Sequence, residues 1–154
     1  TAGEAVMYHR FFQYDDFKGS VPQRLNGSMI SMAEGPAVAY GIEALQDRGG
    51  FFISPGDVIY AGQIVGEHCK DKDIIVNVQK SKKLTNMRAA GSDRNIVIVP
   101  AVNFSLEQCL EYVNDGDLVE ITPQSIRLRK SILDEHARKR EKMRQQTLEE
   151  ESAE

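Results

Sequence analysis

The sequence predicts a small, mainly β domain with two helices, of the α+β class. Three observations support this prediction: about six to eight short β-favouring runs are separated by Gly and Pro turns, helical periodicity occurs at two places, and the strand spacing is irregular. Such strands favour a closed or partly closed barrel, and a small OB-like β-barrel is the expected architecture. With 154 residues, of which 41% are hydrophobic, the chain can bury one full core.

The first predicted strand covers residues 4–14, which are rich in aromatic residues and apolar on both faces. Residues 15–25 contain Gly19 and Pro22 and are typical of a linker. One strand cannot form a domain, so we expect its partner strands in a longer polypeptide. We also expect an unpaired strand of this kind to be able to exchange with a neighbouring molecule, although the fragment itself is expected to be a monomer.

A short strand over residues 28–33 and a helix over residues 36–49 are predicted next. Pro36 suits the first turn of that helix and Gly49 its end, whereas Gly41 weakens it by up to about 1 kcal/mol. Three apolar residues recur at helical spacing, namely Val38, Ile42 and Leu45.

Further β-rich runs follow, with turns predicted at Pro55-Gly56 and Ala61-Gly62. Residues 73–79 and 95–102 are two more predicted strands. Between them lies the polar segment 80–94, which we therefore expect to be a long loop joining two strands.

The second helix is predicted from a capping box, in which Ser105 accepts from the backbone and Gln108 reaches back to it. Phe104 and Cys109 fit the flanking hydrophobic staple. Its predicted apolar face consists of Leu106, Cys109, Leu110 and Val113. Residues 114–116 end the helix, and two strands are expected over residues 118–122 and 125–130, the second with alternating Ile126, Arg127, Leu128 and Arg129.

The tail from residue 134 is highly charged and almost without core residues. It is either a solvated helix or disordered, and its composition favours fraying to disorder from about Lys142.

Several classes of function are excluded or disfavoured. The chain has no GxxxxGK[ST] phosphate loop and no GxSxG nucleophile elbow. Three scattered histidines argue against a metal site, and two distant cysteines indicate reduced thiols in a cytoplasmic protein. No apolar run reaches the roughly 18 residues of a membrane span. Asp71 and Asp73 are interpreted as solvated turn residues. We expect neither a catalytic centre nor a bound cofactor or metal in this fragment.

The strongest candidate for function is the segment 80–94, KSKKLTNMRAAGSDR. It holds five cations and one anion in a chain of net charge -4, so the remainder carries -8. Lysines attract phosphates, arginines provide forked donors, and amide and hydroxyl groups suit the RNA backbone and its 2′-hydroxyls. The predicted RNA-binding residues are Lys80, Lys82, Lys83, Thr85, Asn86, Arg88, Ser92 and Arg94. The alternative is a hairpin tip whose lysines only keep it soluble.

Secondary RNA-binding candidates are Arg48, Arg127, Arg129 and Lys130. They would extend the surface only if the fold brings them to the same side as the loop.

Several long motifs together resemble the C-terminal region of the TypA/BipA family of translational GTPases, which are similar to elongation factor G. They are HRFFQYDDFKGSVPQRLNGSMISMAEGPAVAYGIEALQDRG, PGDVIYAGQIVGEH, KKLTNMRAAGSD and FSLEQCLEYVNDGDLVEITPQSIRLRK. The resemblance extends from about Gly3 to Arg140.

The resemblance implies three parts of the chain: residues 1–18 as the last strand of a ferredoxin-like domain, residues 19–133 as the family-specific C-terminal domain, and residues 134–154 as a charged tail. It implies a cytoplasmic, ribosome-associated protein that acts in stress adaptation and large-subunit assembly, with GTP and Mg²⁺ bound elsewhere in the parent protein. A loop of this domain would contact the acceptor end of A-site tRNA and large-subunit rRNA, a role that Lys82, Lys83, Thr85, Asn86, Arg88 and Ser92 inherit by position. The alternative is a module that binds a ribosomal or regulatory protein.

Overall fold

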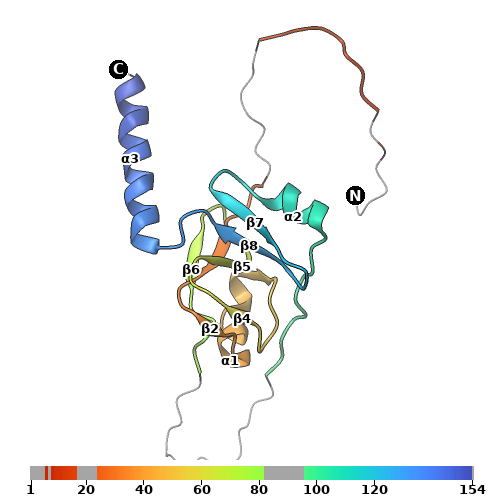
Figure 1. Cartoon of the computed structure of the whole chain (residues 1–154), viewed down its shortest axis with the longest axis vertical. Coiled ribbons are helices and arrows are strands. Elements are labelled where there is room, and N and C mark those ends of the chain that lie inside the picture. The colour runs from red at the N-terminus through yellow and green to blue at the C-terminus, as the bar shows by residue number, and fades with distance from the viewer. Residues whose placement is uncertain (1–5, 7, 17–23, 82–95, 154) are drawn as a thin grey trace, which may run out of the picture.

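The fold is organised around strand β5 (Gln63–His68), which lies at the centre of a six-stranded sheet. The computed structural model describes residues 6, 8–16, 24–81 and 96–153 (Figure 1). The strand order is β6-β1-β5-β8-β7, with β1 (Ser28–Ser31) antiparallel to β5 and parallel to β6 (Ile74–Val76). Strands β7 (Asp117–Ile121) and β8 (Ile126–Lys130) form an antiparallel hairpin.

The sheet does not close into a barrel within the described residues. One edge of β5 pairs first with β8, through Gln63 and Ile64, and then with β3 (Gly49–Phe51), through Gly66, Glu67 and His68. β7 ends the strand order at one side and β6 at the other, and no pairing joins them. The prediction of a mainly β, α+β domain is confirmed. The predicted OB-like barrel is not seen, because β8 and β3 share one edge of β5 and the sheet does not continue round into a closed ring.

A hydrophobic cluster lies on each face of β5, because neighbouring residues of a strand point to opposite sides. Val65 belongs to the larger cluster and Ile64 to the smaller one. Helix α1 (Ala39–Glu43) adds Ile42 to the larger cluster, and burying such a side chain fully stabilises the fold by about 1.5–3 kcal/mol. Helix α2 (Leu106–Tyr112) adds Cys109 and Tyr112 to the smaller cluster.

The first predicted helix is shorter than its periodicity suggests. Pro36 lies in the small sheet formed by β2 (Gly35–Pro36) and β4 (Val58–Ile59), not in a helical turn. After α1 the chain tightens into the 3-10 helix η1 (Gln46–Arg48). Gly49 follows η1 with a φ of 154°, a conformation that favours glycine, whereas the α-helix itself ends earlier than predicted, at Glu43.

Helix α2 begins with the predicted capping box: Gln108 N donates to Ser105 Oγ, and Ser105 N donates to Gln108 Oε1. Phe104 packs in the same cluster as Cys109, as the staple requires. The predicted apolar face is wrong at Leu110, which is 56% exposed; Tyr112 is buried instead. The Tyr112 ring lies in a group with Phe52 and Phe104, at centroid distances of 5.3 and 5.5 Å.

Two predicted strands are not formed among the described residues. Residues 8–14 have no strand partner, and Tyr8 and Tyr14 are 92% and 95% exposed. Residues 96–102 are also outside the sheet. A strand requires a neighbouring backbone edge, and β propensity alone cannot provide one.

The charged tail forms helix α3 (Glu135–Ala153), where the composition favoured disorder from about Lys142. Asp134 caps its first turn, with Ala137 N donating to Asp134 Oδ2 at 2.7 Å. No helix in the described part of the chain is both long and apolar enough to cross a bilayer.

Candidate nucleic-acid interface

Most of the predicted RNA-binding segment lies outside the described residues. This applies to Lys82, Lys83, Thr85, Asn86, Arg88, Ser92 and Arg94. Lys80 is described and is exposed to solvent. What the structure does show is how the chain leaves the body at Ser81 and returns at Ile96, both near α1 (Figure 1).

The outgoing arm, residues 77–81, is held by an apolar side chain and an amide. Val78 is fully buried in the larger cluster, and its carbonyl accepts from Val38 N at 2.9 Å. Gln79 Nε2 donates to Ala33 O at 2.8 Å. A Cβ at Gly41 would lie 2.5 Å from Val78 O. Glycine is therefore required at position 41, because only a residue without a side chain lets this arm approach α1 so closely.

The returning arm, residues 96–102, is bound mainly by one glutamine side chain. Gln46 Nε2 donates to Val97 O at 2.8 Å, and Val99 N donates to Gln46 Oε1 at 2.6 Å. Ile98, between them, packs against the larger cluster. The side-chain amide of Gln46 thus replaces the backbone of a neighbouring strand, which explains an extended arm outside the sheet. We call Gln46, Val78, Gln79 and Ile98 the loop base.

Arg48 and Arg129, two of the secondary candidates, are accessible to different degrees. Arg48 is exposed on η1, and its backbone carbonyl accepts from Cys69 N. Arg129 is half-buried on β8 and donates from Nη1 to Lys130 O at 3.3 Å.

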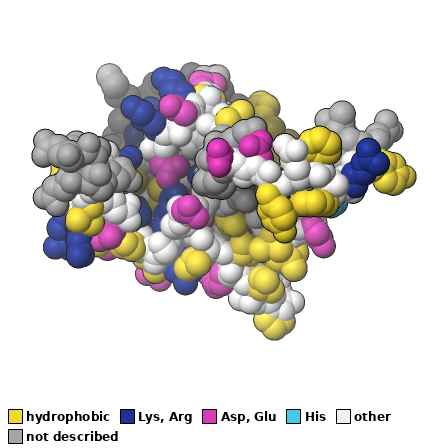
Figure 2. Space-filling model, turned by 90° about the horizontal axis from the view of Figure 1, so that it is seen from above, with side chains coloured by type: hydrophobic (Ala, Val, Ile, Leu, Met, Phe, Trp, Pro, Cys, Tyr) yellow, Lys and Arg dark blue, Asp and Glu magenta, His cyan; other side chains and the backbone are white. Residues whose placement is uncertain are grey.

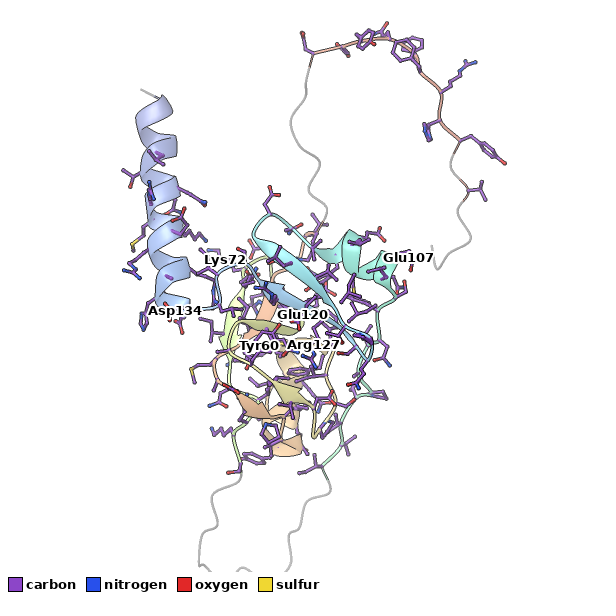
Figure 3. All side chains as sticks on the ribbon, in the orientation of Figure 1. Tyr60, Lys72, Glu107, Glu120, Arg127 and Asp134 are labelled. Atoms are coloured by element: carbon purple, nitrogen blue, oxygen red, sulfur yellow. The ribbon has the colours of Figure 1, made fainter. Side chains whose placement is uncertain are left out.

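Arg127 lies in a small polar group with Tyr60 and Glu120 (Figure 3). Its Nη1 is 3.7 Å from Glu120 Oε1, and Tyr60 Oη donates to Glu120 Oε2 at 2.5 Å. Burial and the Glu120 carboxylate raise the pKa of Tyr60 to about 12. Arg127 therefore has a weak, half-exposed partner that a phosphate could displace.

Lys130, the fourth secondary candidate, is compensated inside the protein. Its Nζ is 2.6 Å from both Asp73 Oδ2 and Asp117 Oδ1. Arg24 Nη1 lies 3.3 Å from Asp117, and its guanidinium is 4.5 Å from the centre of the Tyr112 ring. The Asp117 side chain has no exposed surface and Lys130 is 11% exposed. We call Arg24, Asp73, Asp117 and Lys130 the buried charge network.

Asp73 contributes to this network, and its interpretation as a solvated turn residue is correct only in part: its side chain is 38% exposed, but it pairs with Lys130 and Arg24. Burial alone would raise the pKa of Asp73, but hydrogen bonds from Lys130 and Ser28 outweigh it and lower the pKa. Ser28 donates to Asp73 Oδ1 from both N and Oγ, at 2.6 and 2.8 Å. The sequence carried no signal for Arg24, which reaches Asp117 across 93 positions.

No metal centre can be assembled from the described residues, because no three His, Cys, Asp or Glu side chains among them are suitably grouped.

A separate cleft of about 730 Å³ lies between β4, the segment before α2, and the turn joining β7 and β8. Its floor includes the buried Ile64 and Leu128. Its rim carries exposed aliphatic side chains from Val58, Val102, Ile121 and Ile126, among polar neighbours such as Asp57, Gln124 and Ser125.

The chain matches a known protein family over more than half of its length. The model of the TypA/BipA C-terminal domain matches residues 26–135. The chain belongs to the TypA/BipA family. It is 48% identical over 141 residues to the large ribosomal subunit assembly factor BipA of Salmonella typhimurium, and equally so to that of Escherichia coli strain K12. The factor of Buchnera aphidicola is 46% identical over the same length.

The family membership predicted from the motifs is thereby confirmed. The alignments cover 91% of this chain but 23% of each relative. The chain thus spans about a quarter of the length of its TypA/BipA relatives. The matched family domain includes the loop base, the cleft and every member of the buried charge network except Arg24.

Proposed function

We propose that this chain is the RNA-binding C-terminal module of a ribosome-associated TypA/BipA GTPase and has no catalytic centre of its own. Its basic segment 80–94 would contact large-subunit rRNA and the acceptor end of A-site tRNA. The relatives are named large ribosomal subunit assembly factors. A large ribosomal subunit is a cytoplasmic particle rich in RNA, so this name agrees with the proposal. GTP and Mg²⁺ would bind in a part of the longer protein, and residues 1–18 would complete a neighbouring domain there.

The loop base is the observation that best supports this proposal. Both arms of the basic segment are fixed at the α1 end of the body, by Val78 and Gln79 on one side and by Gln46 and Ile98 on the other. The two points at which the segment enters and leaves the body are therefore fixed. A lower entropy cost on binding is the advantage that such pre-organisation gives.

A salt titration tests the proposal. The 154-residue chain is bound to purified large ribosomal subunits at several potassium chloride concentrations. If the segment neutralises about four phosphates of single-stranded RNA, the slope of log K against log salt is roughly -3. Lys82→Ala/Lys83→Ala should make this slope shallower by about 1.4.

The charge-matched control is Arg10→Ala/Lys70→Ala, which removes two exposed cations outside the segment. It should leave the slope near the wild-type value. An unchanged slope in the Lys82→Ala/Lys83→Ala variant would refute RNA binding by the segment.

The cleft supports a second candidate, a module that binds an apolar segment of a ribosomal or regulatory protein. Its exposed aliphatic rim is the specific observation in favour. In that case Val102→Asp/Ile121→Asp would abolish binding to the subunits, whereas the loop variant would retain it.

A further inference from the structure

The edge of β5 that β8 and β3 share leaves part of β8 unpaired. β8 stops pairing with β5 at the pair of Leu128 with Ile64, and the pairing of β3 begins at Gly66. The first two residues of β8, Ile126 and Arg127, therefore have β7 on one side and no strand on the other among the described residues. Both line the cleft of about 730 Å³. The cleft thus lies beside an unpaired length of β8.

The free backbone edge of β8 is at Ile126. In an antiparallel hairpin only alternate residues exchange hydrogen bonds with the partner strand. Thr122 N donates to Ser125 O, so the odd-numbered residues of β8 bond to β7. The even-numbered residues face the other way, and Lys130 N accordingly donates to Gly62 O, directly before β5. The N–H and C=O of Ile126 therefore point away from β7, and no other part of the described chain bonds to them.

The side chains around this edge suit an extended aliphatic segment. A strand added beside β8 would turn alternate side chains toward the floor of the cleft and toward solvent, because side chains of a strand alternate between its two faces. A peptide that adds to a sheet edge gains affinity from backbone hydrogen bonds and specificity from pockets for alternate side chains. The cleft offers both, with a buried apolar floor and exposed aliphatic residues at the rim, namely Ile64 and Leu128 below and Val58, Val102, Ile121 and Ile126 above.

We propose that the cleft binds an extended, aliphatic segment of a protein of the large ribosomal subunit, which adds as a strand to β8 at Ile126. This inference rests on the second candidate function and specifies the form of the bound segment and the backbone groups that hold it. It does not depend on RNA binding by the segment 80–94.

The charges of the cleft argue against RNA as the occupant. Of the described residues that line it, only Asp57 and Arg127 are charged, and their charges cancel. Arg127 is also paired with Glu120. Seen from above, Lys and Arg side chains lie mainly in the left half of the molecule, toward α3, and exposed hydrophobic side chains mainly in the right half (Figure 2). RNA binding requires an excess of positive charge that this cleft does not have.

A second copy of the chain is a less suitable occupant. Its residues 8–16 lie outside the sheet, but their exposed apolar side chains are aromatic, as at Phe11 and Phe12, and not aliphatic. Its residues 96–102 are aliphatic, but they are fixed at the loop base by Gln46 and Ile98. An aliphatic strand from another protein meets neither obstacle.

A proline substitution separates strand addition from simple apolar packing. Ile126→Pro removes the free N–H but no hydrogen bond of the hairpin, and proline is tolerated at the first residue of a strand. In binding of the 154-residue chain to purified large ribosomal subunits, this variant should be about three- to tenfold weaker, because one hydrogen bond is lost. The matched control Ile126→Val retains the N–H and an aliphatic side chain and should bind like wild type. Circular dichroism and urea unfolding check that both variants are folded.

Hydrogen exchange in the wild-type chain gives a second measurement, which decides the question even if Ile126→Pro does not fold. The Ile126 amide should exchange rapidly in the free chain and slowly on the subunit. The Leu128 amide faces β5 and should be protected in both states. With Val102 replaced by photoreactive p-benzoylphenylalanine, the chain should cross-link to an aliphatic segment of a ribosomal protein.

Several results would overturn the inference. They are a wild-type affinity for Ile126→Pro, an equal loss for Ile126→Pro and Ile126→Val, an Ile126 amide that stays unprotected on the subunit, and cross-links to rRNA or to a second copy of the chain. If Val102→Asp/Ile121→Asp weakens binding but Ile126→Pro does not, the second candidate function stands and only strand addition fails. If neither variant weakens binding, both fail.

Discussion

The buried charge network and helix α3 both carry several cations, but they differ in how these cations are compensated. Lys130 and Arg24 each lie near Asp73 and Asp117, and little of either side chain reaches solvent. Arg140 and Arg144 are exposed and have no described partner. The comparison shows that a basic residue in this chain is available to a partner only when the fold leaves it uncompensated.

The two regions also differ in what their charges do for folding. The network joins three places in the chain. Arg24 comes from the linker before β1, Asp73 from the residue before β6, and Asp117 and Lys130 from the β7–β8 hairpin. It therefore fixes where the chain enters the domain. Helix α3 joins nothing comparable beyond its first turns. Removing charge should destabilise the first region and leave the second unchanged or more stable.

The largest effect is expected for Asp117→Asn. This change preserves size but leaves Lys130 and Arg24 buried with one carboxylate, and removing one partner of a buried pair costs about 3–5 kcal/mol. Urea denaturation measures the free energy of unfolding. The control is Arg127→Ala, which breaks a half-exposed pair with Glu120 and should cost under about 1 kcal/mol. Equal losses for the two variants would mean that the network is no stronger than a surface ion pair.

Stability should also fall in acid because of the network. The pKa of Asp73 is lowered in the folded state, so its contribution is complete above the unfolded pKa of about 3.9 and is lost as the pH falls through the lower folded value. Thermal denaturation between about pH 5 and pH 2 should show this loss. In Asp73→Asn the same curve should be flatter. A variant curve as steep as that of wild type would assign the acid sensitivity to other carboxylates.

Local signals made part of the fold predictable. The Ser105 capping box and the β8 strand each depend on neighbours within a few positions, and each is found in the structure. The Gln46 contacts and the position of Arg24 were not predictable, because they join residues about 50 or more positions apart and have no period. The same limit applies to Lys130. The alternating residues of β8 correctly predicted a strand, but they could not predict the ion pair between Lys130 and Asp117.

A smaller effect is expected for Gln46→Ala at the loop base. The side chain makes two hydrogen bonds to the returning arm, and a hydrogen bond of this kind contributes about 1 kcal/mol net. Hydrogen exchange at the Val99 amide should therefore become roughly 5- to 30-fold faster, the range for losing one or both bonds, with little change in global unfolding. Gln46→Glu retains an acceptor for Val99 N and should show a smaller increase. If exchange at Val99 is unaffected in both variants, the arm is held by Ile98 and by the hydrogen bond from Val102 N to Phe51 O, not by Gln46.

The smallest effect, and the one of opposite sign, is expected for Arg140→Ala/Arg144→Ala on α3. Removing a like-charged i,i+4 pair relieves about 0.2–0.5 kcal/mol of repulsion, and alanine adds helix propensity. Helicity measured by circular dichroism should stay constant or rise slightly, and the urea midpoint should not fall. Added salt should raise the helicity of wild type toward that of the variant, because ions screen exposed charges. A clear loss of stability would show that these arginines are compensated within the folded chain, as Lys130 is.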